Sequence, residues 1–169
     1  AIDTATESLA YYPVQVEKFL QRFEILVAEH GEARVRQAWS DEERTIADEF
    51  IAHAKVIRTE REAAGREGRP PRLVELLRSW GGVTIAYRKR LIDSPSYTLN
   101  HEEVEKALEE GIVFAEGLTP LRVEVDEHGH AKALRVSVQE RNTEGVWHHH
   151  DEIELPARSI LVAAGTHPN

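Results

Sequence analysis

The sequence predicts an α/β fold in which a parallel sheet with an antiparallel hairpin is joined to an all-helical block. Three observations support this prediction. Apolar residues recur at helical spacing as far as residue 81, and after Gly82 their period changes from 3.6 residues to 2. A short apolar run at 83–87 ends in basic residues and precedes an amphipathic helix, an order typical of α/β domains. A continuous apolar run at 159–164 is typical of a strand buried on both faces.

Helices are predicted first along the chain. Residues 1–12 have apolar side chains at helical spacing but no preceding N-cap, so we expect a helix that has already begun before Ala1 in a longer protein. Pro13 is expected to interrupt this helix and to be the first residue of another one. The apolar stripe of that second helix ends at His30 and Gly31.

A capping box at 40–43 predicts the start of a long helix, because Ser40 and Glu43 can each satisfy a free backbone amide. The residues predicted to face inward on it are Ile46, Phe50, Ile51, Ala54 and Ile57. The charged, glycine-containing stretch 58–69 predicts a solvated extension or linker, and a short helix is expected at 73–80. Residues 13–81 therefore form a helical block, without any spacing typical of a catalytic site.

Strands dominate the expectation after Gly82. A strand at 83–88 is followed by a helix at 101–110, for which Asn100 is the predicted cap, and by a short strand at 112–114. Val104, Ala107 and Leu108 are predicted to face inward on this helix. The segments 120–125 and 132–138 flank turn-forming residues and predict a β-hairpin. Further strands are predicted at 146–155 and 159–164.

The composition excludes several classes of function. The chain has 21 Lys and Arg against 30 Asp and Glu, a net charge of −9, which argues against nucleic acid as a partner. With no cysteine, disulfides, thiolate catalysis and zinc–thiolate sites are excluded. No apolar run approaches the roughly 20 residues of a membrane span, and no signal peptide is visible. We therefore expect a cytoplasmic protein without a membrane partner.

Three blocks of sequence resemble one family. Residues 83–89 (VTIAYRK) form a strand that ends in Tyr and two basic residues, 100–112 form an acidic helix that ends in Glu-Glu-Gly, and 154–169 end in AAGTHPN. Together they resemble the pyridine-nucleotide-binding part of the flavin-dependent pyridine nucleotide–disulfide oxidoreductase superfamily, and especially its glutamate synthase small-subunit branch. Residues 1–3 are similar to the helix that follows the family's glycine-rich turn.

The resemblance implies a partial Rossmann-like NAD(P)-binding domain that is incomplete at its N-terminus. Residues 1–12 would be its first helix, 13–81 a helical insertion, and 82–169 the remainder. The family's glycine-rich turn, whose backbone amides hold the pyrophosphate, is absent from this sequence. We therefore expect the chain by itself to be inactive and to bind NADPH weakly or not at all.

In the parent protein, the resemblance implies hydride transfer from NADPH to FAD, with FAD bound outside this chain. A base at the end of the second strand of such a domain accommodates the 2′-phosphate of NADPH, whereas an acid selects NADH. The implied cofactor-binding residues are Tyr87, Arg88, Lys89, Gly165 and Thr166. The implied partners are the flavin domain of the same parent chain and a partner subunit or electron acceptor at the helical insertion. Self-association through an unpaired strand is also expected.

Alternative interpretations remain for the same residues. The basic residues after the strand would also suit a solvated turn, and residues 13–81 would also suit a non-catalytic docking module for a partner subunit. His148 and His150 share one face of a predicted strand and, with His128 or His130 across a hairpin, would suit zinc or nickel. An exposed polar strand explains the same histidines without a metal.

Overall fold

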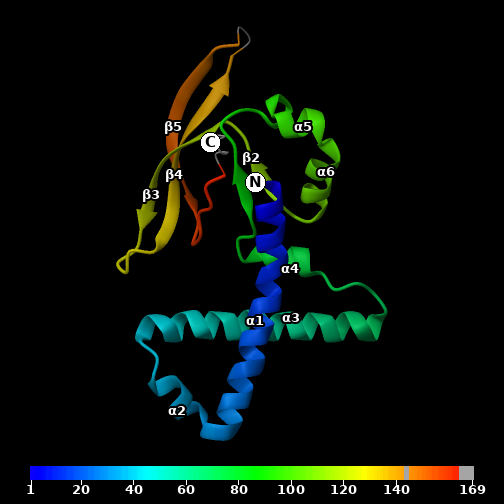
Figure 1. Cartoon of the computed structure of the whole chain (residues 1–169), viewed down its shortest axis with the longest axis vertical. Coiled ribbons are helices and arrows are strands. Elements are labelled where there is room, and N and C mark those ends of the chain that lie inside the picture. The colour runs from blue at the N-terminus through cyan, green and yellow to red at the C-terminus, as the bar shows by residue number, and fades with distance from the viewer. Residues whose placement is uncertain (143–144, 164–169) are drawn as a thin grey trace, which may run out of the picture. The chain divides into compact units, whose positions relative to one another are not determined.

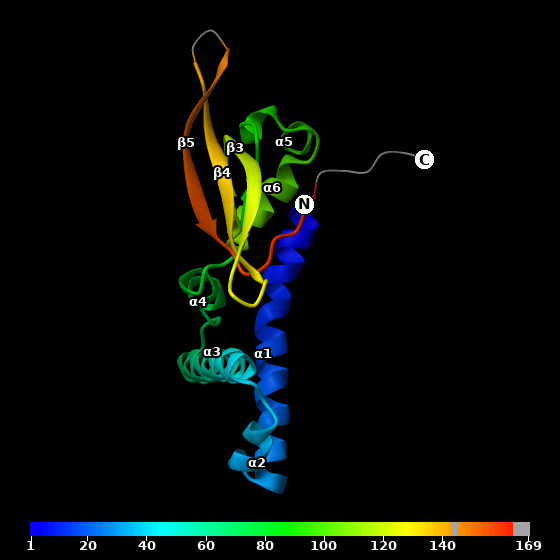
Figure 2. The same cartoon turned by 90° about the vertical axis from the view of Figure 1, so that its left-hand side faces the viewer.

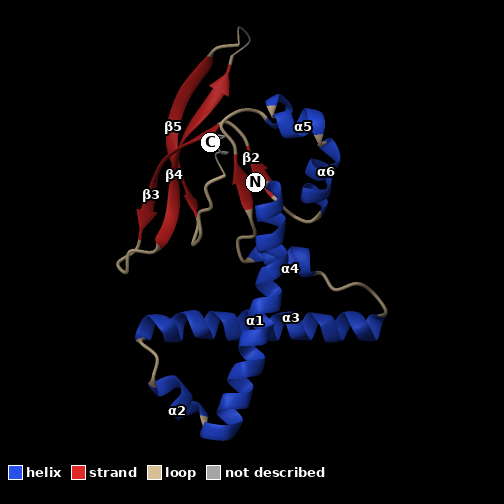
Figure 3. Ribbon diagram, in the orientation of Figure 1, coloured by secondary structure: helices blue, strands red, loops and turns tan. Residues whose placement is uncertain are grey.

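A computed structural model describes residues 1–142 and 145–163 and confirms a mixed α/β protein (Figures 1 and 3). The chain divides into two compact units, one of Thr6–Gly82 and the other of Ala1–Ala5 with Val83–Asn169. Helices form the first unit, whereas strands and shorter helices form the second (Figure 3). Among the helices of the described residues, none combines the length and the apolarity that a bilayer span requires.

Four helices belong largely to the first unit: α1 (Ile2–His30), α2 (Glu32–Gln37), α3 (Asp41–Glu67) and α4 (Leu73–Ser79). The predicted break at Pro13 is wrong, because α1 continues through this residue. Proline removes one helical hydrogen bond, a loss that packing can offset. Leu9 and Val16 flank Pro13 on α1 with only 7% and 1% of their surface exposed, so buried side chains hold the helix on both sides of the proline.

The capping box at the start of α3 is confirmed. The Glu43 amide donates to Ser40 Oγ at 3.2 Å, and the Ser40 amide donates to Glu43 Oε2 at 2.7 Å. The linker predicted at 58–69 is wrong over most of its length, because α3 continues to Glu67 and ends at Gly68 with a left-handed φ of 66°. Ion pairs hold this charged half of α3, and they join Arg58 to Glu24 and Arg61 to Glu17 of α1. The charged stretch is therefore part of the helix, and its apolar face includes the buried Ala64.

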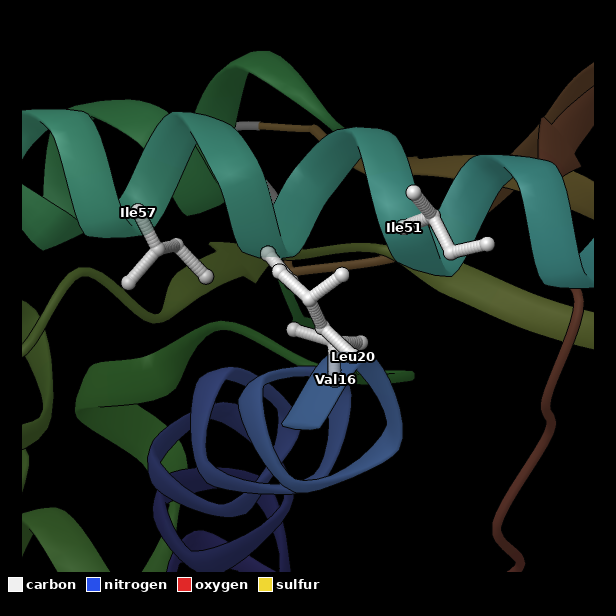
Figure 4. Packing of buried hydrophobic residues seen from close by; sticks show 5 residues of the cluster. Val16, Leu20, Ile51 and Ile57 are labelled. Atoms are coloured by element: carbon white, nitrogen blue, oxygen red, sulfur yellow. The ribbon is translucent and has the colours of Figure 1, made fainter. Parts of the chain in front are cut away.

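The core of the helical unit lies where α1 and α3 cross (Figures 1 and 4). Val16 and Leu20 of α1 face Ile51 and Ile57 of α3, and each is at most 6% exposed (Figure 4). The partly buried residues around them are Tyr12, Phe19, Phe23, Phe50, Leu73 and Trp80. Ile46 was predicted to face inward but is 38% exposed, since it lies in the first turns of α3, before the buried cluster begins.

The connection from α3 to α4 is held by one carboxylate. Arg69 Nη1 donates to Glu60 Oε1 at 2.5 Å, and the Arg72 amide donates to the same oxygen at 2.8 Å. Only 18% of the Glu60 side chain is exposed. The Arg69 hydrogen bond, assisted by the Arg72 amide, lowers the pKa of Glu60 from its ordinary 4.5 to about 2.

Because this pKa is lower in the folded state than in the unfolded state, Glu60 stabilises the unit above pH 4.5 and this contribution disappears as the pH falls towards 2. We expect Glu60→Gln to flatten the pH dependence of the free energy of unfolding in this interval. Urea titrations followed by circular dichroism at several pH values measure it. The exposed Glu75→Gln is the control and should keep the wild-type slope. Equal slopes for wild type and Glu60→Gln would contradict the prediction.

The second unit has two sheets. β1 (Thr84–Ala86) and β2 (Val113–Ala115) pair in parallel, with Thr84 opposite Val113. The helical segments between them are η1 (Leu91–Asp93), α5 (Pro95–Leu99) and α6 (His101–Glu109). The antiparallel sheet consists of β3 (Leu118–Val125), β4 (Ala131–Arg141) and β5 (Trp147–Pro156), in that order (Figure 2). The predicted hairpin is therefore confirmed, and β5 extends it to three strands.

Three expectations for this unit differ from the structure. Asn100 precedes α6, but its side chain forms no cap hydrogen bond, because its φ of −138° and ψ of 50° are unusual for a cap. Leu108 was predicted to face inward and is 49% exposed. The described part of the predicted last strand, 159–163, contains no strand, and Leu161 and Val162 are 64% and 86% exposed. An apolar run needs a neighbouring strand for its backbone hydrogen bonds, and none of the described strands pairs with it.

Candidate functional site

The carboxyl end of the parallel pair presents the basic residues singled out in the sequence. The Tyr87 amide donates to the Ala115 carbonyl at 2.8 Å, and the Tyr87 carbonyl accepts from the Leu118 amide at 3.0 Å. The hydrogen bond to Ala115 extends the pairing of β1 by one residue, and the Tyr87 side chain is half-buried. Arg88 and Lys89 follow immediately and are exposed. The strand therefore delivers both cations to the sheet edge where α/β proteins bind ligands.

The three consecutive cations differ in their partners. Arg90 makes two hydrogen bonds to the Asp93 carboxylate, at 2.9 and 3.0 Å, and these raise the pKa of Arg90. Within residues 1–142 and 145–163, Arg88 and Lys89 make no ion pair. Arg90 therefore has a structural partner three residues along the chain, whereas Arg88 and Lys89 can meet an anion from outside.

The loop that contains these cations is held by the connection between β2 and β3. Glu116 Oε1 accepts from the Leu91 amide at 2.5 Å, and the Gly117 amide donates to the Lys89 carbonyl at 3.4 Å. Glu116 thus binds a backbone amide rather than either free cation. Hydrogen bonds at Tyr87, Lys89 and Leu91 hold the backbone on both sides of Arg88 and Lys89. The positions that the two side chains can reach are therefore restricted.

Sequence reasoning missed Gly117, on which this arrangement depends. Gly117 has a φ of 67°, and its carbonyl accepts from the Gln139 amide of β4 at 2.6 Å. A Cβ at this position would lie 2.4 Å from the Gln139 carbonyl oxygen. The signal in the sequence is a glycine two residues after the end of a short strand, which indicates a turn or a close backbone approach.

The other predicted site residues are not brought to this edge by the described structure. Gly165 and Thr166 lie outside the described residues. His148 and His150 lie near one end of β4, where their rings contact Asn142 Nδ2 at 3.1 Å and Glu140 at 3.4 Å. The turn with His128 and His130 lies at the other end.

The distance between the two pairs of histidines argues against the metal site suggested by the sequence. The turn and the other histidines lie at opposite ends of an eleven-residue strand, roughly 30 Å apart. Among the described residues, no group of three potential metal ligands gathers. The structure therefore does not assemble the histidine set that the sequence suggested for zinc or nickel.

Comparison with known proteins gives a relative but no function. No family model matches the chain. Over 138 residues, 82% of the chain, it is 38% identical to the uncharacterized protein RP006 of Rickettsia prowazekii (strain Madrid E). The chain spans only 17% of the length of that relative. The similarity therefore relates most of this chain to a small part of a much longer protein.

Proposed function

We propose that the chain contributes to NADPH binding in a flavin-dependent NAD(P)H oxidoreductase, as an incomplete Rossmann-like domain with a helical insertion. The observation that supports it most is a parallel pair, β1 and β2, with helices between its strands and two unpaired cations beyond the end of β1. Arg88 binds phosphate through its guanidinium fork, and Lys89 adds a second positive charge. Their side chains suit the 2′-phosphate that distinguishes NADPH from NADH.

In the parent protein, the cofactors and the protein residues would have different roles. Nicotinamide and flavin supply hydride transfer when bound, while protein residues bind and orient them. In this chain, Arg88 and Lys89 would hold the adenosine end of NADPH, and the backbone anchors at Leu91 and Gly117 would keep them in place.

The test is whether the loop distinguishes a 2′-phosphate. We expect adenosine 2′,5′-bisphosphate to shift the amide NMR resonances of 87–91 and 115–117, and adenosine 5′-monophosphate to shift them much less. Loss of a charge-assisted hydrogen bond costs about 1.5–3 kcal/mol, or roughly tenfold or more in affinity. The Arg88→Ala/Lys89→Ala variant should therefore lose the response.

Arg90→Ala is the matched control, because it removes one charge from the same loop at a residue already paired with Asp93. This variant should retain most of the response to the bisphosphate. Equal responses to the two nucleotides, or an unchanged response in the Arg88→Ala/Lys89→Ala variant, would contradict the proposal. Adenosine 3′,5′-bisphosphate tests whether the position of the phosphate matters as well as its charge.

A docking role for the helical unit is the second candidate. Four large apolar side chains of α1 are exposed, Tyr11 at 59%, Val14 at 39%, Ile25 at 53% and Leu26 at 44%. Tyr11 and Val14 are neighbours on the helix surface, Ile25 and Leu26 are consecutive, and such apolar groups could contribute to a docking surface if a partner covers them. Deleting 13–81 from the parent protein would separate the roles: loss of association with retained NADPH oxidation favours docking, whereas loss of oxidation favours a part in the active site.

A further inference from the structure

A hollow in the helical unit has a lining that the NADPH proposal does not use. Its volume is about 220 Å³, and it is lined by Tyr12, Gln15, Val16, Lys18, Phe19 and Arg22 of α1 and by Phe50 of α3. Tyr12, Gln15, Phe19 and Arg22 follow one another at intervals of three and four residues, so they form one stripe along α1. The hollow therefore combines aromatic and nitrogen-bearing side chains within one unit.

Its walls are aromatic and fixed by contact. The Phe50 ring meets the Tyr12 ring edge to face at 6.2 Å and the Phe19 ring at 5.7 Å. The Tyr12 hydroxyl is bound to His53 Nδ1 at 2.6 Å, and the His53 ring stacks on Trp80 at 3.8 Å. Tyr12 is thus held in place and offers its ring, rather than its hydroxyl, to the hollow.

The remaining polar side chains of the lining, Gln15, Lys18 and Arg22, all carry hydrogen-bond donors. Gln15 Nε2 is buried and has no hydrogen-bond partner among the described residues. A buried donor without an acceptor costs about 1–3 kcal/mol. Lys18 and Arg22, one helical turn apart, are exposed and make no ion pair within the described part of the chain. The lining that the structure describes contains no carboxylate.

We propose that this hollow binds a small aromatic carboxylate. The ring packs against Phe19 and Phe50, and Lys18 and Arg22 neutralise the charge. A rotation of the Gln15 side chain brings Nε2 out of its buried position to donate to one carboxylate oxygen. Pockets for drug-sized ligands measure about 300–1,000 Å³, so this smaller hollow suits a ligand with a single ring. A neutral ligand would leave both cations unpaired, and a cationic ligand would be repelled by them.

The test uses the ¹⁵N-labelled chain and three probes of one shape: 3-phenylpropionate, 3-phenylpropanol and 3-phenylpropylamine. We expect the carboxylate to shift the amide resonances of 12–22 and of Phe50, with a Kd at least about fivefold lower than that of the alcohol. The amine should bind more weakly than either. Carboxylate binding should weaken as sodium chloride is raised, because Lys18 and Arg22 are exposed.

Two variants test the assigned residues. Gln15→Leu should weaken binding of 3-phenylpropionate about fivefold without weakening that of the alcohol. If leucine fills the hollow, both ligands are lost, and Lys18→Gln/Arg22→Gln then decides; it should remove the preference for the carboxylate. Arg66→Gln, an exposed cation elsewhere on α3, is the control and should change nothing. Equal affinity for carboxylate and alcohol in the wild type, or carboxylate shifts outside the hollow, would overturn the proposal.

Discussion

Ile57→Ala is expected to destabilise the helical unit by about 2–5 kcal/mol, a large part of the stability of a small domain. Ile57 is fully buried and packs in the cluster where α1 crosses α3. Truncation to alanine removes three carbons from contact with this cluster and leaves a cavity, and both changes cost free energy. Urea unfolding followed by helical circular dichroism measures the effect.

The preceding residue supplies the control. Val56 lies on the same helix and is 43% exposed, so Val56→Ala removes aliphatic carbons largely from water. Its expected cost is within about 0.5 kcal/mol. If the two variants unfolded at the same urea concentration, the packing of α3 against α1 would not be the source of stability in this unit.

Gly117→Ala is expected to destabilise the strand-containing unit by about 3 kcal/mol or more. Two costs add at this position. A left-handed φ costs a non-glycine residue about 1–2 kcal/mol. The new methyl group would also lie 2.4 Å from the Gln139 carbonyl oxygen, so backbone must shift and the hydrogen bond from Gln139 to Gly117 is strained. Hydrogen exchange at the amides of β3 and β4 measures the loss.

Gly129→Ala separates the two costs. Gly129 has a φ of 82°, but a Cβ there would meet nothing within 4 Å. Gly129→Ala should lower the free energy of unfolding by only the cost of the left-handed φ, about 1–2 kcal/mol. If Gly117→Ala destabilises the protein no more than Gly129→Ala does, the close approach between Gly117 and Gln139 does not contribute to the cost of the substitution. The nucleotide response of Arg88 and Lys89 should weaken in the Gly117 variant, because the Gly117 amide holds the Lys89 carbonyl.

Local signals in the sequence predicted much of the fold. The pairing of Ser40 with Glu43 depends on residues three apart, so the start of α3 was visible without tertiary information. The alternation after Gly82 predicted the hairpin of β3 and β4, and the short apolar run predicted β1. Because Arg88 and Lys89 follow this apolar run in the sequence, their position beyond the end of β1 was also predicted.

Other features depend on distant contacts that the sequence does not display. Pro13 was predicted to break a helix, but burial of its neighbours on α1 keeps the helix continuous. The charged half of α3 was predicted to be a linker because its partner Glu24 lies 34 residues away in the sequence. Gly117 was missed because its constraint comes from Gln139 on another strand. The pairing of Arg90 with Asp93, in contrast, spans three residues and was open to sequence reasoning.

The crossing of α1 and α3 has a consequence for the order of folding. The buried cluster joins Val16 to Ile51, 35 positions apart, whereas Thr84 and Val113 of the parallel pair are 29 positions apart, so the entropy cost of closing the chain is similar in the two cases. Three helical segments, η1, α5 and α6, lie between the two strands of that pair. During synthesis, residues 6–82 leave the ribosome before either strand of that pair. We therefore expect the helical segment to acquire its structure first and to be protected from proteases while the later strands are still unpaired.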